Sequence, residues 1–467
     1  MTGRRRTVRV LLPGGVIVLL LGALILAAVA PAAVDETILI SRQSATDGGA
    51  GGDARSSAAA VSADGRYVAF ESAANNLSSD DNNRLINLFL RDTQTNTTTL
   101  ISRRSGADGV AADGNSGKPS ISADGRYVAF ESKAKNLSGV DNDFIFDVFV
   151  RDTQANTTVL VSRQSAADGG AGADVHALNP SISADGRFVA FESNSYEFST
   201  ADNDSFRDVF LRDLSTSTTT LISRVTGASG LGGDDNSSNA SVSADGKFVA
   251  FQSQANNLST ADDNTFPNVF VRNIEAGTTT LASRGSGATG AAADGPSNKP
   301  SISGNGRFLA FESHANSLST ADNNRFMNVF RRDMETGALT LVSRRSATDG
   351  GAGAVGASSA PSLSTDGRFV AFESLANNLS AADDDLYRNV FLRDVQAAST
   401  ILVSRQSVAD GGAGADGRSF APSVSTGGRF VAFDSEALNL SAEDSDQPVG
   451  GEGEGGVRDV FLRQVLP

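Results

Sequence analysis

The chain has 467 residues, no cysteine, two histidines and a formal net charge of −15. These numbers exclude a disulfide framework and any thiolate ligand or nucleophile, and they argue against a multi-histidine metal centre and against binding to nucleic acid. An apolar content of 39% is enough for a folded core, yet the aromatic residues are unusual, with 26 Phe, 4 Tyr and no Trp.

Residues 1–33 have the three parts of a secretory signal peptide. Arg4, Arg5, Arg6 and Arg9 form a positive region, an apolar stretch covers residues 11–29, and small residues follow up to Ala33. We predict cleavage near Ala33. An uncleaved membrane anchor is the alternative, because the apolar stretch is nearly long enough to span a bilayer. Either outcome makes residues 34–467 secreted, periplasmic or exposed at the cell surface. An uncleaved N-terminal segment is the only membrane contact we expect.

The rest of the chain is one unit repeated seven times, at intervals of 60 or 61 residues. Its first motif is Ser-Ala-Asp-Gly-Arg-Tyr-Val-Ala-Phe-Glu-Ser at 62–72, and it returns with variations from Ser122, Ser183, Ser243, Ser303, Ser364 and Ser425. A second motif, Asn-Leu-Phe-Leu-Arg-Asp at 87–92, follows each copy of the first. A third ends in Ser-Arg.

Each unit is predicted to form four short strands, called a to d. In the second unit, residues 119–122 form strand a, and Asp124-Gly125 form a tight hairpin turn to strand b at 126–132. The Val-Phe-Val-Arg segment forms strand c, and strand d ends in Ser-Arg. Four antiparallel strands in a repeat of this length indicate a blade of a β-propeller.

The two ends of the repeated region complement each other. Residues 37–42 read as a strand d with no preceding strands, and the chain stops after a strand c at 459–463. We therefore predict an all-β, seven-bladed β-propeller over residues 34–467, with the N-terminal strand completing the last blade. Closure of this kind removes free sheet edges.

The repeat accounts for most of the phenylalanines. One Phe lies on strand b and one on strand c of every unit, for example Phe251 and Phe270, and five more follow the turn glycine. We interpret them as core residues packed between blades, since a ligand platform would not need every blade alike.

The first motif resembles the propeller repeat of the TolB-like, WD-repeat-like family of bacterial exported propellers, in which a Ser-Pro-Asp-Gly-Lys turn precedes an Ile-Ala-Phe-type strand. The resemblance covers the whole of 34–467. It implies a propeller fold and a periplasmic or secreted location. TolB itself has six blades and an additional domain, and neither is present here, so the resemblance does not imply its role in outer-membrane integrity.

The b–c connections contain the one recurrent pattern of acidic residues. Asp141, Asp143 and Asp147 in the second unit are repeated as Asp202, Asp204 and Asp208 in the third, and other units replace one or two of them with Asn. Asx-turns at the start of strand c explain this spacing, and we favour that interpretation. Ca²⁺ binding is the alternative, because Ca²⁺ takes several oxygen ligands from flexible loops.

Other polar residues are assigned structural roles. The Glu after the strand b Phe and the Arg of strand c are expected to pair across strands, and the two histidines are expected to be solvated. Antiparallel connectivity is expected to put the long b–c and d–a loops on one face, where binding sites are common.

These features favour a monomeric binding or scaffold module for a protein or a polysaccharide, with no catalytic residues and no certain cofactor. The alternative is a glycan-active hydrolase or lyase that uses the central channel. Such an enzyme should have blade-specific acids or bases on strand a, which reads as small and uniform.

Overall fold

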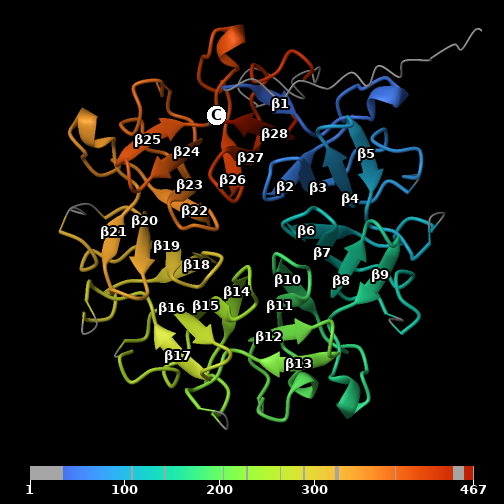
Figure 1. Cartoon of the computed structure of the whole chain (residues 1–467), viewed down its shortest axis with the longest axis vertical. Coiled ribbons are helices and arrows are strands. Elements are labelled where there is room, and N and C mark those ends of the chain that lie inside the picture. Colours follow the sequence, from blue (N-terminus) through green and yellow to red (C-terminus); the bar gives the residue numbers. More distant parts are fainter. Residues whose placement is uncertain are drawn as a thin grey trace, which may run out of the picture. The chain divides into compact units, whose positions relative to one another are not determined.

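In a computed structural model of the chain, residues 35–465 are described except 82, 107–108, 141–142, 203, 228–229, 263, 288–289, 321–324, 384 and 445–456. The predicted signal peptide or anchor, residues 1–33, lies outside the described residues. Within the described residues the strands form seven antiparallel sheets of four strands each. Figure 1 shows these sheets following one another around a ring, as predicted for a seven-bladed propeller.

The blades follow the repeats. Blade 1 contains β2 (Ser56–Val61), β3 (Tyr67–Ser72), β4 (Asn87–Asp92) and β5 (Thr97–Leu100). Blade 2 contains β6 (Ser116–Ile121), β7 (Tyr127–Ser132), β8 (Asp147–Asp152) and β9 (Thr157–Leu160). Blade 3 contains β10 (Ala177–Ile182), β11 (Phe188–Ser193), β12 (Asp208–Asp213) and β13 (Thr218–Leu221). Blade 4 contains β14 (Ser237–Val242), β15 (Phe248–Ser253), β16 (Asn268–Asn273) and β17 (Thr278–Leu281).

Blade 5 contains β18 (Ser297–Ile302), β19 (Phe308–Ser313), β20 (Asn328–Asp333) and β21 (Leu339–Leu341). Blade 6 contains β22 (Ser358–Leu363), β23 (Phe369–Ser374), β24 (Asn389–Asp394) and β25 (Ser399–Leu402). Blade 7 contains β26 (Ser419–Val424), β27 (Phe430–Ser435), β28 (Asp459–Gln464) and β1 (Thr37–Leu39). Short 3₁₀ helices lie in the connections: η1 (Ala45–Asp47), η2 (Ala166–Asp168), η3 (Tyr196–Phe198), η4 (Ala347–Asp349) and η5 (Val408–Asp410).

The predicted closure of the ring is confirmed. Strand β1 pairs antiparallel with β28, with Thr37 opposite Arg463 and Leu39 opposite Phe461. The first described residues therefore form the outer strand of a blade whose other three strands come from the end of the described chain.

The core lies between neighbouring blades, as predicted. In each blade the Phe of strand b and the Phe of strand c are direct cross-strand partners, and their rings stack; Phe251 and Phe270 have ring centroids 5.8 Å apart and are fully buried. This pair packs against Ala190, Val209 and Leu211 of the preceding blade. Each interface thus joins the phenylalanine face of one blade to the small aliphatic face of another.

Two features of the structure require glycine in the a–b turn. Gly246 has φ of +70°, a conformation that L side chains rarely adopt. A Cβ atom there would also collide with the ring of Phe188, the first residue of strand b in the preceding blade. The repeated Asp-Gly turn is therefore part of the contact between blades as well as a hairpin signal.

The d–a loops begin on the face that they share with the b–c loops, as predicted, and they extend from it to the outer rim. The loop after β1 turns outward as a hairpin closed by an Arg42–Gly51 bridge. Its tip contacts blade 1, where Ser44 Oγ accepts a hydrogen bond from Thr98 N at 2.9 Å and Ala45 N donates to Asn96 O at 2.9 Å. Figure 1 shows the corresponding excursions outside the fourth strands of the blades. The b–c loops and the bases of the d–a loops make up the remaining face, here called the b–c loop face.

In the described part of the chain, no helix has the length and apolar character needed to span a bilayer.

Candidate functional site

The acidic b–c loops form the predicted Asx-turns. Asp202 Oδ1 accepts a hydrogen bond from Asp204 N at 3.3 Å, and Asp204 Oδ1 accepts one from Phe206 N at 2.9 Å. The same bonds recur in blade 1, where Asp81 and Asn83 accept from backbone N–H groups two residues on. These turns lead directly into strand c.

In blades 1, 4 and 6 an asparagine at the first position of strand c completes the network. Asn87 Nδ2 donates to Asp81 Oδ1 at 3.1 Å and to Asn83 Oδ1 at 2.9 Å, while its own Oδ1 accepts from Ser102 Oγ at 2.8 Å. Asn268 and Asn389 make the equivalent bonds. A neutral amide therefore donates to one oxygen of each of the two loop residues, while Oδ2 of Asp81 has no hydrogen-bond partner.

Blade 3 has an aspartate at this position, and three carboxylates meet. Ligand oxygens of Asp202, Asp204 and Asp208 lie within 4.8 Å of one another. Asp208 is fully buried and Asp202 is 6% exposed, and Oδ2 of each has no hydrogen-bond partner. Burial, opposed by a hydrogen bond from Ser223, raises the pKa of Asp208 to about 8, and burial raises the pKa of Asp202 to about 6.

The remaining predicted ligands are in blade 2. Asp141 lies outside the described residues. Asp143 Oδ1 accepts from Ile145 N at 3.0 Å, and the buried Asp147 Oδ1 accepts from Ser162 Oγ at 2.6 Å. Asp143 and Asp147 therefore accept the same local hydrogen bonds as Asp204 and Asp208 of blade 3.

The b–c loop face also carries exposed aromatic side chains that the sequence analysis did not single out. They occupy the position two residues before strand c, and the structure exposes 40–47% of Phe206, Phe266, Phe326 and Tyr387. In the sequence, these phenylalanines can be found by elimination. They are the ones that remain after the repeated Phe positions of strands b and c have been assigned to the core.

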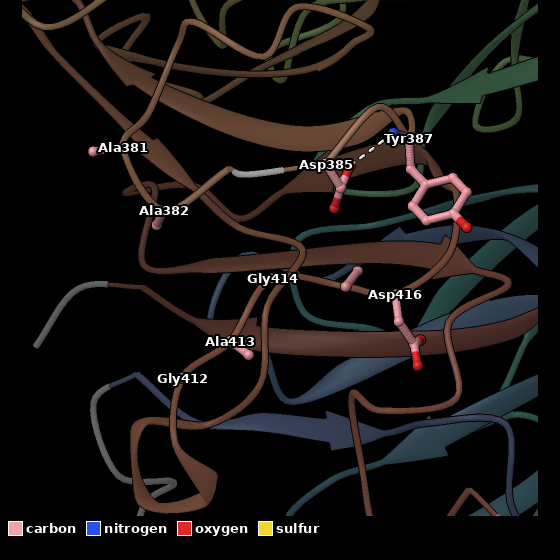
Figure 2. Close-up of a pocket in the computed structure, with 9 residues that line it drawn as sticks. Ala381, Ala382, Asp385, Tyr387, Gly412, Ala413, Gly414 and Asp416 are labelled. Atoms are coloured by element: carbon pink, nitrogen blue, oxygen red, sulfur yellow. Dashed lines mark hydrogen bonds between the residues drawn. The ribbon is translucent and has the colours of Figure 1, made fainter.

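One of these aromatics borders a groove between blades 6 and 7 with a volume of about 460 Å³. Figure 2 shows Asp385 and Tyr387 on the b–c loop of blade 6, with Asp416 on the facing loop base. Asp385 Oδ1 accepts a hydrogen bond from Tyr387 N at 2.7 Å, which holds the loop beneath the ring. The groove therefore combines one partly exposed aromatic ring with two carboxylates.

The predicted pairing of the strand b acids with the strand c arginines is wrong. Glu71 lies opposite Leu88 and Arg91 lies opposite Val68, so the two side chains project from opposite faces of the sheet. Arg91 Nη1 instead donates to Gln43 O at 2.9 Å, in the loop that precedes the blade.

The strand b acids instead connect each blade to the next around the channel. Glu131 Oε2 accepts a hydrogen bond from Asn179 N at 2.8 Å, and Glu312 Oε2 accepts one from Ala360 N at 2.9 Å. Gln252 makes the same contact in blade 4, to Lys299 N at 3.2 Å. Some of them also form ion pairs with the residue before strand c, as between Asp434 and Arg458 at 3.1 Å, whereas Glu312 pairs with Lys299 of strand a at 3.6 Å.

The donors of these bonds are bulged residues of strand a with positive φ, and they differ from blade to blade. They line a channel mouth of about 340 Å³. The residues at this position are Ala58, Lys118, Asn179, Asn239, Lys299, Ala360 and Ala421. Strand a is thus less uniform than predicted, because the strands begin earlier than expected, and the variable residue precedes the repeated Pro-Ser-Ile-Ser segment.

The other end of the channel has a smaller volume, about 150 Å³. Backbone hydrogen bonds link successive a–b turns there, such as Ala63 N to Ala123 O at 3.0 Å and Ala123 N to Ala184 O at 3.0 Å. Its walls are aliphatic residues, including Val61 and Ile121. Thr365 and Thr426 contribute hydroxyl groups at this end, whereas the wide mouth has amide and amine side chains.

Asp434 should give the stability of the protein a measurable pH dependence. Burial raises its pKa from 3.8 to about 7, with Arg458 acting in the opposite direction and Glu373 in the same direction. The folded state therefore holds a proton that the unfolded state has lost, so this contribution to stability is full below about pH 4 and is lost as the pH rises through 7. The slope is at most about 1.4 kcal/mol per pH unit.

Asp434→Asn removes this titration and resembles the neutral Gln252 of blade 4. Urea unfolding of both proteins between pH 4 and 8 should show wild type losing stability relative to the variant as the pH rises. Parallel pH profiles would contradict the assignment.

No protein-family model matches the chain, and no curated protein matches its sequence. An oligogalacturonate lyase in complex with manganese matches with a TM-score of 0.51 and 13% identity, over 93% of this chain and 98% of that one. The β-propeller domain of the Trilobed protease from Pyrococcus furiosus matches with a TM-score of 0.50 and 10% identity, over 89% of this chain and 98% of that one.

TolB from Acinetobacter baumannii is also among the matches, with a TM-score of 0.38 and 14% identity over 75% of this chain. The chain spans 64% of the length of that TolB. At these identities the matches show the propeller fold alone.

Proposed function

We propose that this protein is an extracytoplasmic binding module whose b–c loop face binds a polysaccharide. The observation that carries the proposal is the repeated, partly exposed aromatic residue at the end of the b–c loops, together with the groove at Tyr387. Export is inferred from the tripartite pattern of residues 1–33. The repeat motif supports a TolB-like origin for the blades, and we expect a monomer that does not bind nucleic acid.

The chemistry of the groove suits a sugar. A sugar ring has an apolar C–H face and an edge of hydroxyl groups, so it fits an aromatic ring with hydrogen-bond acceptors beside it. Tyr387 supplies the ring, and the carboxylates of Asp385 and Asp416 supply the acceptors. Equivalent aromatics at Phe206, Phe266 and Phe326 would give a long chain several contacts, each weak alone.

The proposal is tested on residues 35–467 with a glycan array, followed by calorimetry with any polysaccharide that binds. Tyr387→Ala should weaken binding about tenfold or more, equivalent to about 1.4 kcal/mol, while Tyr387→Phe should keep most of the affinity because the ring is retained. Equal binding by Tyr387→Ala would contradict a role for the groove. If no glycan on the array binds, and a protein binds to the b–c loop face instead, the partner is a protein rather than a polysaccharide.

The second candidate is a glycan-active hydrolase or lyase that uses the wide channel mouth. It is favoured by Lys118 and Lys299, which supply amines at a position where other blades have Ala or Asn. A lysine can act as a general base or bind an anionic sugar. Release of new reducing ends or of an unsaturated product from acidic polysaccharides, lost in Lys118→Ala and Lys299→Ala, would support this candidate over a pure binding role.

A further inference from the structure

Blades 3 and 6 have the same acids in their b–c loops but differ at the first residue of strand c. In blade 6, Asn389 Nδ2 donates to Asp383 Oδ1 and to Asp385 Oδ1, both at 3.2 Å. Its Oδ1 accepts from Ser404 Oγ at 2.6 Å. One amide therefore supplies donors to two carboxylates and uses its own acceptor.

Blade 3 lacks this donor. Ser223 Oγ donates to Asp208 Oδ1, as the corresponding serines do in other blades. Oδ2 of Asp208 and Oδ2 of Asp202 have no hydrogen-bond partner, although both residues are more than nine-tenths buried. Blade 1 has one such oxygen, Oδ2 of Asp81, so the second one, on Asp208, is what distinguishes blade 3 from blade 1. Within the described residues, none of the three acids forms an ion pair with a basic side chain. Buried carboxylates without partners are costly, so the site calls for a positive charge.

The middle residue of the loop changes in a matching way. In blades 1 and 4 it is an Asn whose Nδ2 donates to a backbone carbonyl, from Asn83 to Ala112 at 2.8 Å and from Asn264 to Ala293 at 3.1 Å. In blade 3 the middle residue is Asp204, which has no donor, and the corresponding carbonyl belongs to Gly233. Blade 3 therefore lacks both amide donors that blades 1 and 4 have, the one at the first position of strand c and the one at the middle of the loop.

We propose that Asp202, Asp204 and Asp208 bind one Ca²⁺ ion, with the Gly233 carbonyl as a further ligand. Carboxylate and carbonyl oxygens are the donors that Ca²⁺ prefers, and a loop with three acids can supply most of the six to eight it takes. The ion replaces the asparagine amide as the positive partner of the loop oxygens. The residue at the first position of strand c thereby decides whether an amide or an ion holds the loop.

Two reciprocal variants test this on chelator-treated protein at pH 7.5, by calorimetric titration with CaCl₂ and by melting temperature with and without Ca²⁺. Asp208→Asn should bind one ion fewer than wild type and should gain less from Ca²⁺ in melting temperature. Without Ca²⁺ it should melt above wild type, because the amide reproduces blades 1, 4 and 6. Asn389→Asp, which gives blade 6 the acids of blade 3, should bind one ion more.

Equal Ca²⁺ stoichiometry in wild type and Asp208→Asn would overturn the proposal. So would a wild type that takes up protons on acidification but gains no ion and no melting temperature with CaCl₂, because protonation alone would then relieve the site. Binding of Mg²⁺ in preference to Ca²⁺ would overturn the choice of ion. The counts are differences between matched proteins, so any other ions bound by the chain cancel.

Discussion

A protein that begins at residue 43 should fail to form a stable monomeric ring. The deleted segment contains β1, whose backbone pairs with β28, and it contains Leu39 and Ile40, which are 2% and 0% exposed. Burying two such side chains contributes roughly 3–6 kcal/mol, a large share of the 5–15 kcal/mol that separates a folded domain from its unfolded state.

The polar contacts of β1 increase the loss. Arg463, 1% exposed, donates to Thr37 Oγ1 at 2.7 Å, and Ser41 Oγ donates to the buried Asp459 at 2.5 Å. Deletion leaves the guanidinium and the carboxylate without these partners and exposes the edge of β28 to pairing with another chain.

The comparison is between proteins beginning at residues 35 and 43, by thermal unfolding and size-exclusion chromatography. The longer protein should be monomeric and melt cooperatively. The shorter one should melt far lower or elute as an aggregate. Equal melting temperatures and a monomeric elution for both would show that β1 is dispensable.

The fold could be predicted from the sequence because the same strand and turn signals occur in seven repeats. A single Asp-Gly turn or a single Phe-containing strand is a weak signal, but identical signals at a fixed interval allow one answer. The closure was also visible, since residues 37–42 copy a strand d that the last repeat lacks. The second role of Gly246 could not be predicted in this way. Its contact with Phe188 joins two blades, and the local sequence of the turn does not indicate it.

The separation of the strand b acids from the strand c arginines follows from the alternation of side chains along a strand. Side chains alternate along a strand, so if Phe70 and Phe89 share a face, Glu71 must lie on the other face and Arg91 on the same one. The path of the d–a loops was not predictable in this way. Their tips are held by hydrogen bonds such as that from Thr98 N to Ser44 Oγ, which depend on where the next blade lies.

The candidate sites, too, could be predicted only in part from the sequence. The sequence placed Asp202, Asp204 and Asp208 together and suggested both Asx-turns and Ca²⁺. The turns are present. The Ca²⁺ site stays a prediction, now concentrated on blade 3, because sequence spacing does not reveal which oxygens lack a donor. The repeat pattern does not point to Lys118 and Lys299, because they stand at a position of strand a where the blades differ, next to the repeated Pro-Ser segment.

Phe251→Ala should destabilise the protein by about 3–5 kcal/mol, the cost of removing a large buried aromatic. Phe251 is 0% exposed and stacks on Phe270 with an interplanar angle of 25°. Its ring lies in the cluster that joins blade 4 to Val209 and Leu211 of blade 3. Removing it creates a cavity in an interface, so the loss should be shared by both blades rather than confined to one strand.

Phe266→Ala is the matched control. It removes the same side chain from the same blade, at a position where 41% of the residue is exposed, so a change of about 0.5 kcal/mol or less is expected. Urea unfolding of the two variants beside wild type measures the difference. A loss below about 1 kcal/mol for Phe251→Ala, or equal losses for both variants, would contradict a core in which one phenylalanine per strand is structural and the loop phenylalanines are left for binding.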